Sequence, residues 1–168
     1  MMTEPQIPVT APAAGLSQEE RNWAMLAHLT ALLSAFVAVS TGGVGYVFAL
    51  LAPLAIYLYF SGRSRHVAYH ALQATVFQAL AGVVYVIVAG AAGAAIAAAW
   101  TIAGVLTMIL IGVLLMPVAL GVTLIAGVLI GGLPLLGLGY ALRAAYLTYH
   151  GQDFDYPWIG PVVARSLT

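Results

Sequence analysis

Long uncharged stretches alternate along the chain with short segments that hold all of its charged residues. The first stretch, between Arg21 and Arg63, has about 40 residues, and the second, between Arg65 and Arg143, has almost twice that number. A membrane-spanning helix needs about 20 predominantly apolar residues. Each stretch is therefore long enough for at least two crossings. The charged residues are Glu4, Glu19, Glu20, Arg21, Arg63, Arg65, Arg143, Asp153, Asp155 and Arg165.

The first stretch contains signals for two helices. The sequence SQEE at residues 17–20 fits a capping box, which satisfies free backbone N–H groups at a helix start, so we expect a helix from there to about Val39. Residues 40–43 end in paired glycines, which disfavour a helix. A second span is predicted over residues 46–60. It includes Pro53, which membrane helices tolerate.

The arginines constrain how often the second stretch crosses the membrane. Positive side chains gather in cytoplasmic loops near the ends of spans. Two crossings separate Arg21 from Arg63 and Arg65, which places these three on one face. If Arg143 and Arg165 share that face, the number of crossings between Arg65 and Arg143 is even.

Two long helices satisfy this requirement, predicted at about Val67–Ala99 and Val105–His150, with a possible break at residues 131–134 (GGLP). The predicted fold is therefore an all-α polytopic membrane protein with four transmembrane helices and both termini in the cytoplasm. Five or six spans remain alternatives, because region 67–150 is long.

Composition supports the membrane assignment. Charged residues make up 6% and hydrophobic residues 63% of the 168 residues, and the mean hydropathy is +1.04. A soluble domain carries about 25% charged residues. The formal net charge is +0 and lysine is absent, so no nucleic acid partner is expected. We expect a disordered tail over residues 1–16, a single transmembrane domain over 17–160 and a C-terminal tail over 161–168.

Histidines near the arginine-bearing ends are the main candidates for chemistry. His28 lies in the first helix, and His66, His70 and Gln73 share one face of the third. His28 and His70 are candidate axial ligands of a haem or chlorin, or a metal pair. The alternative is that they form hydrogen bonds between helices. No carboxylate or cysteine completes a familiar metal set. We therefore predict no metal site and no bound cofactor, and favour hydrogen bonding.

The acids do not suggest catalysis. All of them lie in the tail, in the first helical turn or in the C-terminal segment, so no acid–base pair is placed inside an apolar span. The pattern around Asp153 and Asp155 is typical of a solvated turn at the membrane interface. Gly151 is a predicted residue after a helix C-terminus. The protein is predicted not to be an enzyme.

Small residues are abundant in the second stretch. Residues 90–99 are almost entirely glycine and alanine, and Gly127 and Gly131 form a GxxxG pattern. Small residues let membrane helices approach closely. The pattern is explained equally well by an interface with another subunit and by packing within one bundle.

Three blocks of the sequence stand out together. They contain Glu20, Arg21, Trp23 and His28; His70 and Gln73; and Gly151, Phe154, Tyr156 and Pro157. The blocks resemble an uncharacterised bacterial membrane family, a domain of unknown function that is similar to the small channel-forming subunit of the chloroplast inner-envelope translocon (the Tic family). The resemblance covers Ser17 to Gly160 and implies four helices with both termini on one side, in the plasma (inner) membrane of a bacterium. The region between the second and third blocks is longer here, and the lysines usual after the second span are absent.

These observations leave three functional hypotheses. The favoured one is a non-enzymatic accessory or helix-packing subunit of a larger membrane complex, with the lipid bilayer and other membrane subunits or further copies of the chain as partners. The first alternative, from the family resemblance, is a component of a protein- or solute-conducting channel. The second is a protein that binds a haem or chlorin through His28 and His70.

Overall fold

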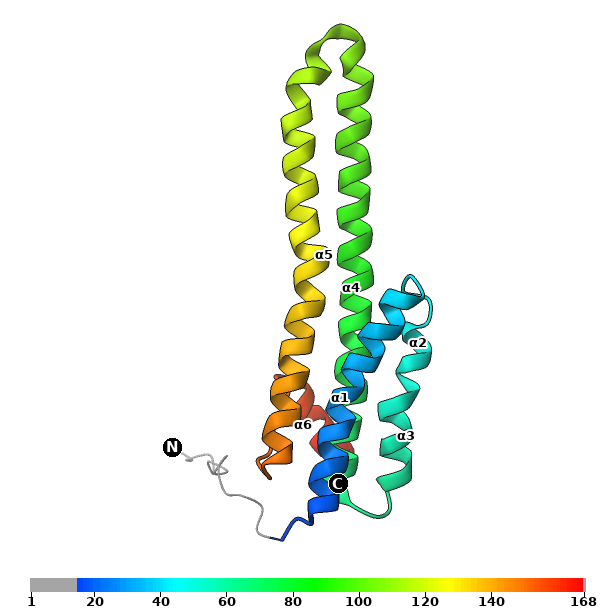
Figure 1. Ribbon diagram of the computed structural model, residues 1–168, viewed down its shortest axis with the longest axis vertical. Coiled ribbons are helices and arrows are strands. Elements are labelled where there is room, and N and C mark those ends of the chain that lie inside the picture. Colours follow the sequence, from blue (N-terminus) through cyan, green and yellow to red (C-terminus); the bar gives the residue numbers. More distant parts are fainter. Residues whose placement is uncertain (1–14, 168) are drawn as a thin grey trace, which may run out of the picture. The chain divides into compact units, whose positions relative to one another are not determined.

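A computed structural model describes residues 15–167, and the regular elements in that range are all helices (Figure 1). This confirms the predicted all-α class. The predicted N-terminal tail lies almost wholly outside the described residues. In chain order the elements are α1 (Gln18–Ser40), α2 (Tyr46–Ala49), α3 (Leu51–Phe60), α4 (Arg65–Leu106), the short 3₁₀ helix η1 (Thr107–Ile109), α5 (Ile111–Tyr149) and α6 (Ile159–Ser166).

Helix α1 begins with the predicted capping box. The Glu20 backbone N–H donates to Ser17 Oγ at 3.1 Å, and the Ser17 N–H donates to Glu20 Oε2 at 2.9 Å. The helix ends at Ser40, and Gly42 and Gly43 follow with positive φ angles of 62° and 93°. Glycine adopts this left-handed region at no steric cost, which explains why the predicted break is a sharp turn.

The second predicted helix is divided at Leu50 into α2 and α3. Pro53 is the third residue of α3 and is buried there. Proline has no N–H to donate to the carbonyl four residues earlier, and its ring crowds that carbonyl. That residue is Ala49, the last of α2, so the division falls where proline removes a helical hydrogen bond.

The second charge-free stretch forms α4 and α5, and its turn lies later in the chain than predicted. The predicted turn, between Ala99 and Val105, is wrong, because α4 continues through it to Leu106. The chain instead reverses over residues 107–110, where Leu110 has a φ of 63°. A Cβ on Gly112 would lie 2.0 Å from the Ala103 carbonyl oxygen, so this close approach requires glycine.

The possible break at residues 131–134 does not occur, since α5 is helical through both Pro117 and Pro134. Among the described residues, three helical segments are long and apolar enough to cross a membrane: Gln18–Ser40, Arg65–Ile109 and Ile111–Tyr149. The apolar segment Tyr46–Phe60 is shorter.

The chain divides into two compact units, which we describe separately. Unit 1 contains residues up to Ala79 and from Leu138 onward, and unit 2 contains Leu80–Gly137. Unit 1 has two small cores, one built on alanines of α1 and α4 and one around Tyr156. In this unit α6 occupies most of the predicted C-terminal tail.

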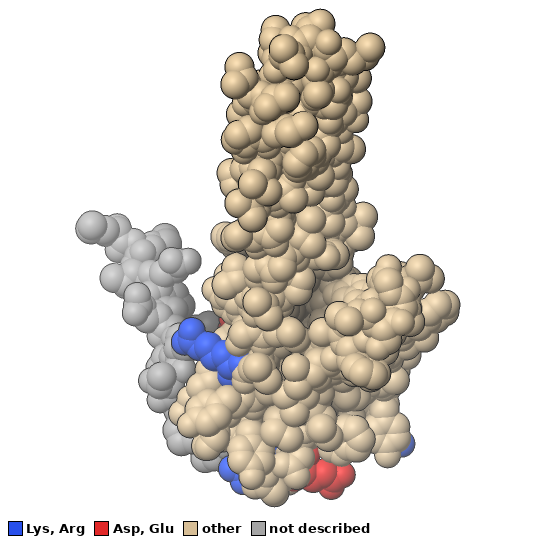
Figure 2. All heavy atoms as spheres, turned by 45° about the horizontal axis from the view of Figure 1, so that its top comes forward, with Lys and Arg blue, Asp and Glu red and all other residues tan. Residues whose placement is uncertain are grey.

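Unit 2 consists of the C-terminal part of α4, η1 and the N-terminal part of α5. It contains no charged residue. In Figure 2 the arginine and acidic side chains in view lie on unit 1, and the visible surface of unit 2 is free of both colours. A bond from Trp100 Nε1 to Thr123 Oγ1, 2.9 Å long, joins the two helices of this unit.

Candidate functional site

A cluster of buried polar side chains occupies the interior of unit 1. His28 comes from α1, His70 and Gln73 come from the first turns of α4, and all three are fully buried. Tyr156, 1% exposed, comes from the segment between α5 and α6. Polar groups removed from water are costly unless they are hydrogen-bonded, so the contacts of this cluster contribute to the stability of unit 1.

Tyr156, His28 and His70 form a continuous line of polar contacts. The Tyr156 hydroxyl lies 3.2 Å from His28 Nδ1, and His28 Nε2 lies 3.3 Å from His70 Nδ1. The Tyr156 ring stacks on Phe77 with centroids 4.1 Å apart. Burial raises the pKa of the Tyr156 phenol, so the hydroxyl stays protonated. His28 contacts a polar neighbour through each of its two ring nitrogens, whereas His70 contacts His28 through Nδ1 and faces Asp153 with Nε2. Because the two rings share a contact, the tautomer of one sets the tautomer of the other.

Gln73 holds the segment after α5 against α4. Its Oε1 accepts a bond of 3.0 Å from the Tyr156 backbone N–H, and its Nε2 donates to the Phe154 carbonyl at 3.3 Å. Phe154 and Tyr156 are buried, while Asp153, Asp155 and Pro157 are exposed. The segment therefore presents alternate residues to the core and to the outside. Asp155 accepts a hydrogen bond from the Tyr69 hydroxyl.

Asp153 joins the two histidines on the first turns of α4. Its Oδ1 lies 3.6 Å from both His66 Nδ1 and His70 Nε2, although its side chain is 61% exposed. One nitrogen from each ring and one carboxylate oxygen all lie within 4.8 Å of one another. The polar contact with His70 is the main factor that holds the pKa of the Asp153 carboxyl below its usual value. This group of His66, His70 and Asp153 is called the His–His–Asp cluster below.

The end of α5 places Asp153 at this position. The Gly151 N–H bonds to the Thr148 carbonyl and the Gln152 N–H bonds to the Leu147 carbonyl, both at 3.0 Å. These are the two bonds of a Schellman motif, and Gly151 has the left-handed φ of 73° that the motif requires. The prediction that Gly151 follows a helix end is confirmed. A side chain at Gly151 would meet Arg21, whose Cδ lies 3.5 Å from the position that a Cβ would take.

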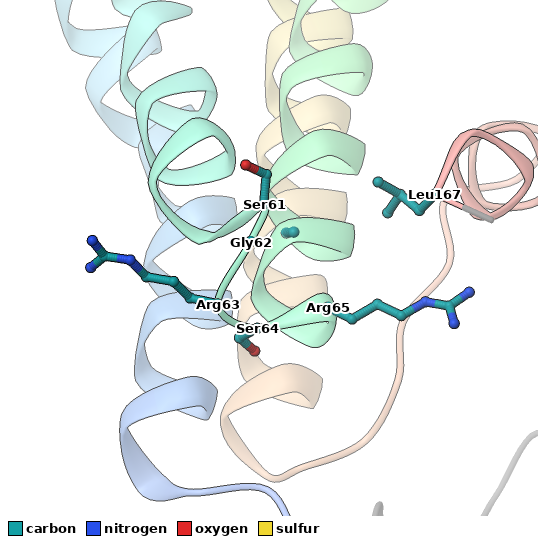
Figure 3. Close-up of a pocket in the computed structure, with 7 residues that line it drawn as sticks. Ser61, Gly62, Arg63, Ser64, Arg65 and Leu167 are labelled. Carbon is teal, nitrogen blue, oxygen red and sulfur yellow. The ribbon is translucent and has the colours of Figure 1, made fainter.

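The remaining motif residues tie the N-terminal turn of α1 to the turn between α3 and α4. Glu20 accepts a bond of 2.8 Å from Ser64 Oγ, and the Trp23 ring lies 5.3 Å from the Phe60 ring. A pocket of about 330 Å³ opens beside this turn (Figure 3). Arg63 and Arg65 flank it with guanidinium groups that point in opposite directions, and Arg63 lies 4.0 Å from the centroid of the Tyr59 ring.

Most of the chain matches the model of a known protein family. The model of the MamF/MmsF family, described as the magnetosome magnetite crystal formation protein family, matches residues 19–163. The chain belongs to the MamF/MmsF family. No curated protein and no solved structure matches it. The match agrees with the predicted bacterial membrane family but does not show the resemblance to the Tic-type subunit.

The region that matches the MamF/MmsF family includes every residue of the buried polar cluster. Sequence reasoning favoured hydrogen bonds between helices for His28 and His70, and the structure brings His28, His70, Gln73 and the aromatic segment after α5 together. Sequence reasoning missed Asp153 as a neighbour of the histidines. The nearest sequence signal was the helix-ending Gly151, which fixes where the following residues turn back. Ligation of a haem or chlorin by His28 and His70 stays an untested alternative, and their facing nitrogens would have to separate for such a group to lie between them.

Proposed function

We propose that this member of the MamF/MmsF family acts in magnetite crystal formation as a non-enzymatic integral membrane protein of the crystal-forming compartment. The observation that carries the proposal is the family match over residues 19–163, which spans all of the long helices. Two of the acids support a non-catalytic role, because Glu20 closes the capping box and Asp155 holds Tyr69 and Gln73. These carboxylates have structural partners.

In the proposed topology the chain crosses the membrane four times, through α1, α2 with α3, α4 and α5, with both termini in the cytoplasm. The distribution of arginine supports it, since all five lie in unit 1 and unit 2 has no charged residue. Positive side chains on one face of the membrane set its orientation. Introduced cysteines at Ser64, Ser166 and Gly42 test the topology, because the chain has no native cysteine. Labelling Ser64→Cys and Ser166→Cys from opposite sides would contradict it.

Within the compartment membrane we propose an accessory role that depends on contact with other membrane helices. Gly127 and Gly131, the GxxxG pair of α5, have no atom of another element within 4 Å of the position a Cβ would take. They are therefore open to an approaching helix instead of being used in the hairpin. Large apolar residues beside them are exposed, including Val128 at 73%. Small residues between large ones favour close helix association in lipid.

The role in crystal formation is tested by deleting the gene in a magnetite-forming host and measuring crystals by electron microscopy. We expect an altered distribution of crystal size or number, restored by the wild-type gene. Distributions that overlap those of the parent strain would overturn the proposal.

The accessory role is tested by affinity purification in mild detergent. We expect stoichiometric membrane partners or additional copies of the chain, which are lost in Gly127→Ile and Gly131→Ile. Leu129→Ile is the matched control, because it changes the shape of a neighbouring residue without filling the open face. Recovery of wild type as a monomer without partners would contradict the accessory role and leave the crystal phenotype to be judged separately.

A further inference from the structure

We propose that the His–His–Asp cluster binds one divalent first-row transition-metal ion, with His66, His70 and Asp153 as its protein ligands. This inference does not rest on the proposed function, because it follows from the geometry of unit 1 alone. Two histidines four residues apart on a helix present their rings on one face, which is the spacing that many helical metal sites use. The ring centroids of His66 and His70 are 4.6 Å apart.

The distances suit ligands of a shared ion better than they suit hydrogen bonds. Asp153 Oδ1 lies 3.6 Å from His66 Nδ1 and 3.6 Å from His70 Nε2. This is longer than a good hydrogen bond. Ligands bound at about 2.1 Å in tetrahedral geometry lie roughly 3.4 Å apart. The separation between the two ring nitrogens is at most 4.8 Å, so the rings would move closer together when an ion binds.

An unpartnered nitrogen atom points to a missing ligand. His70 Nε2 is buried and has no hydrogen-bond partner among the described residues, whereas the unpartnered nitrogen of His66 is Nε2 and not the Nδ1 that faces Asp153. The His70 side chain is fully buried, and its Nε2 is the atom that faces Asp153. Buried polar atoms in native proteins are nearly always satisfied. A metal ion at this position would accept the lone pair of His70 Nε2 and remove the need for a hydrogen-bond partner.

The surrounding residues can fix the ring of His70 for this purpose. Ligating histidines usually donate their second ring N–H to an outer partner, which sets the tautomer. With His70 Nε2 on the metal, its Nδ1–H donates to His28 Nε2 at 3.3 Å. His28 Nδ1–H then donates to the Tyr156 hydroxyl oxygen at 3.2 Å. His28 and Tyr156 are therefore positioning residues, which act on the metal through His70.

The ligand set defines the class of ion. Two imidazoles and one carboxylate suit Zn²⁺ and the ions of the iron group, and three protein ligands leave positions for water or a further ligand. The hard cations Mg²⁺ and Ca²⁺ prefer oxygen ligands. Because the Asp153 side chain is 61% exposed, an ion has a path to the cluster from the surface of unit 1.

The test uses the full-length protein, purified in detergent without a polyhistidine tag and titrated with Co²⁺. We expect one bound ion per chain and visible absorption bands of Co²⁺ with nitrogen and oxygen ligands, displaced by Zn²⁺. Asp153→Asn and His66→Gln should weaken binding by more than the roughly 10- to 100-fold caused by loss of an outer-shell partner. Both side chains are partly exposed, so these variants are expected to fold.

Two matched controls change the same residue types outside the cluster. His150→Gln and Glu19→Gln alter an exposed histidine and an exposed acid, and both should bind Co²⁺ as wild type does. The inference is overturned if wild type binds no stoichiometric Co²⁺, or if Asp153→Asn and His66→Gln bind it as tightly as the controls. Because binding is measured on purified protein, this result is independent of the crystal phenotype, which can fail or succeed separately.

Discussion

Unit 1 holds every charged residue of the described chain and a network of buried polar contacts, whereas unit 2 holds no charge and is an apolar helical hairpin. In unit 1 the positions of α1, α4 and the segment after α5 are specified by directional bonds. In unit 2 the helices are specified by apolar composition and by one tight turn. Both ways of specifying the fold are compatible with a lipid environment, but single substitutions should change the stability of the two units by different amounts.

The largest effect is expected from removing the central aromatic ring of unit 1. Tyr156→Ala deletes a side chain that is 1% exposed and stacked on Phe77, so the free energy of unfolding should fall by about 3–5 kcal/mol. The measurement is unfolding in mixed detergents followed by circular dichroism. Trp158→Ala is the control, since Trp158 is 89% exposed and its loss should change stability by less than about 0.5 kcal/mol. Equal effects of the two substitutions would show that the segment is not docked as described.

The second-largest loss in the free energy of unfolding is expected when the bonds made by Gln73 are removed. Gln73→Leu keeps most of the volume but leaves the Tyr156 N–H and the Phe154 carbonyl without their side-chain partner, which costs about 1–3 kcal/mol for a buried group. Gln152→Leu, at an exposed position of the same segment, should have little effect. The same unfolding measurement checks both. A stable Gln73→Leu protein would mean that packing alone holds the segment.

In unit 2 the sensitive position is the turn. Gly112→Ala places a methyl group against the Ala103 carbonyl oxygen and the Thr107 backbone nitrogen, and the required shift should cost about 1–3 kcal/mol. Gly104→Ala introduces the same group at a site with nothing within 4 Å and should be neutral or slightly stabilising. If the two variants unfold alike, the hairpin does not depend on the close approach at Gly112.

Local signals in the sequence were sufficient for α1 and for the end of α5. A capping box and a helix-ending glycine act within a few residues, so the roles of Ser17, Glu20 and Gly151 could be predicted directly. The turn at residues 107–110 could not, because glycines are scattered through this region and only the close approach at Gly112 distinguishes one of them. Membrane helices also tolerate proline, so Pro134 did not mark a break.

The candidate site was predictable in part for the same reason. The spacing of His66, His70 and Gln73 on one face of a helix follows from helical geometry. The approach of Asp153 depends on how the chain folds back after α5, and no pattern within either segment encodes that contact. No carboxylate lies near His66 and His70 in the sequence, and the tertiary structure brings Asp153 to them.

The smallest loss in the free energy of unfolding is expected when a hydrogen bond of unit 2 is removed. Setting this loss beside that of a bond removed from unit 1 tests the difference between the two units directly. Thr123→Val removes the 2.9 Å bond from Trp100 Nε1 at an exposed position, and interhelical bonds in membranes contribute about 0.6 kcal/mol on average. Ser34→Ala in unit 1 removes a bond of similar length, 2.7 Å to Gln78 Oε1, but both of its groups are buried. The buried acceptor then loses its donor, at a cost of about 1–3 kcal/mol. Unfolding in mixed detergents should therefore separate the two variants, because burial and not the presence of a hydrogen bond determines the loss. Equal losses would show that the two units are stabilised in the same way.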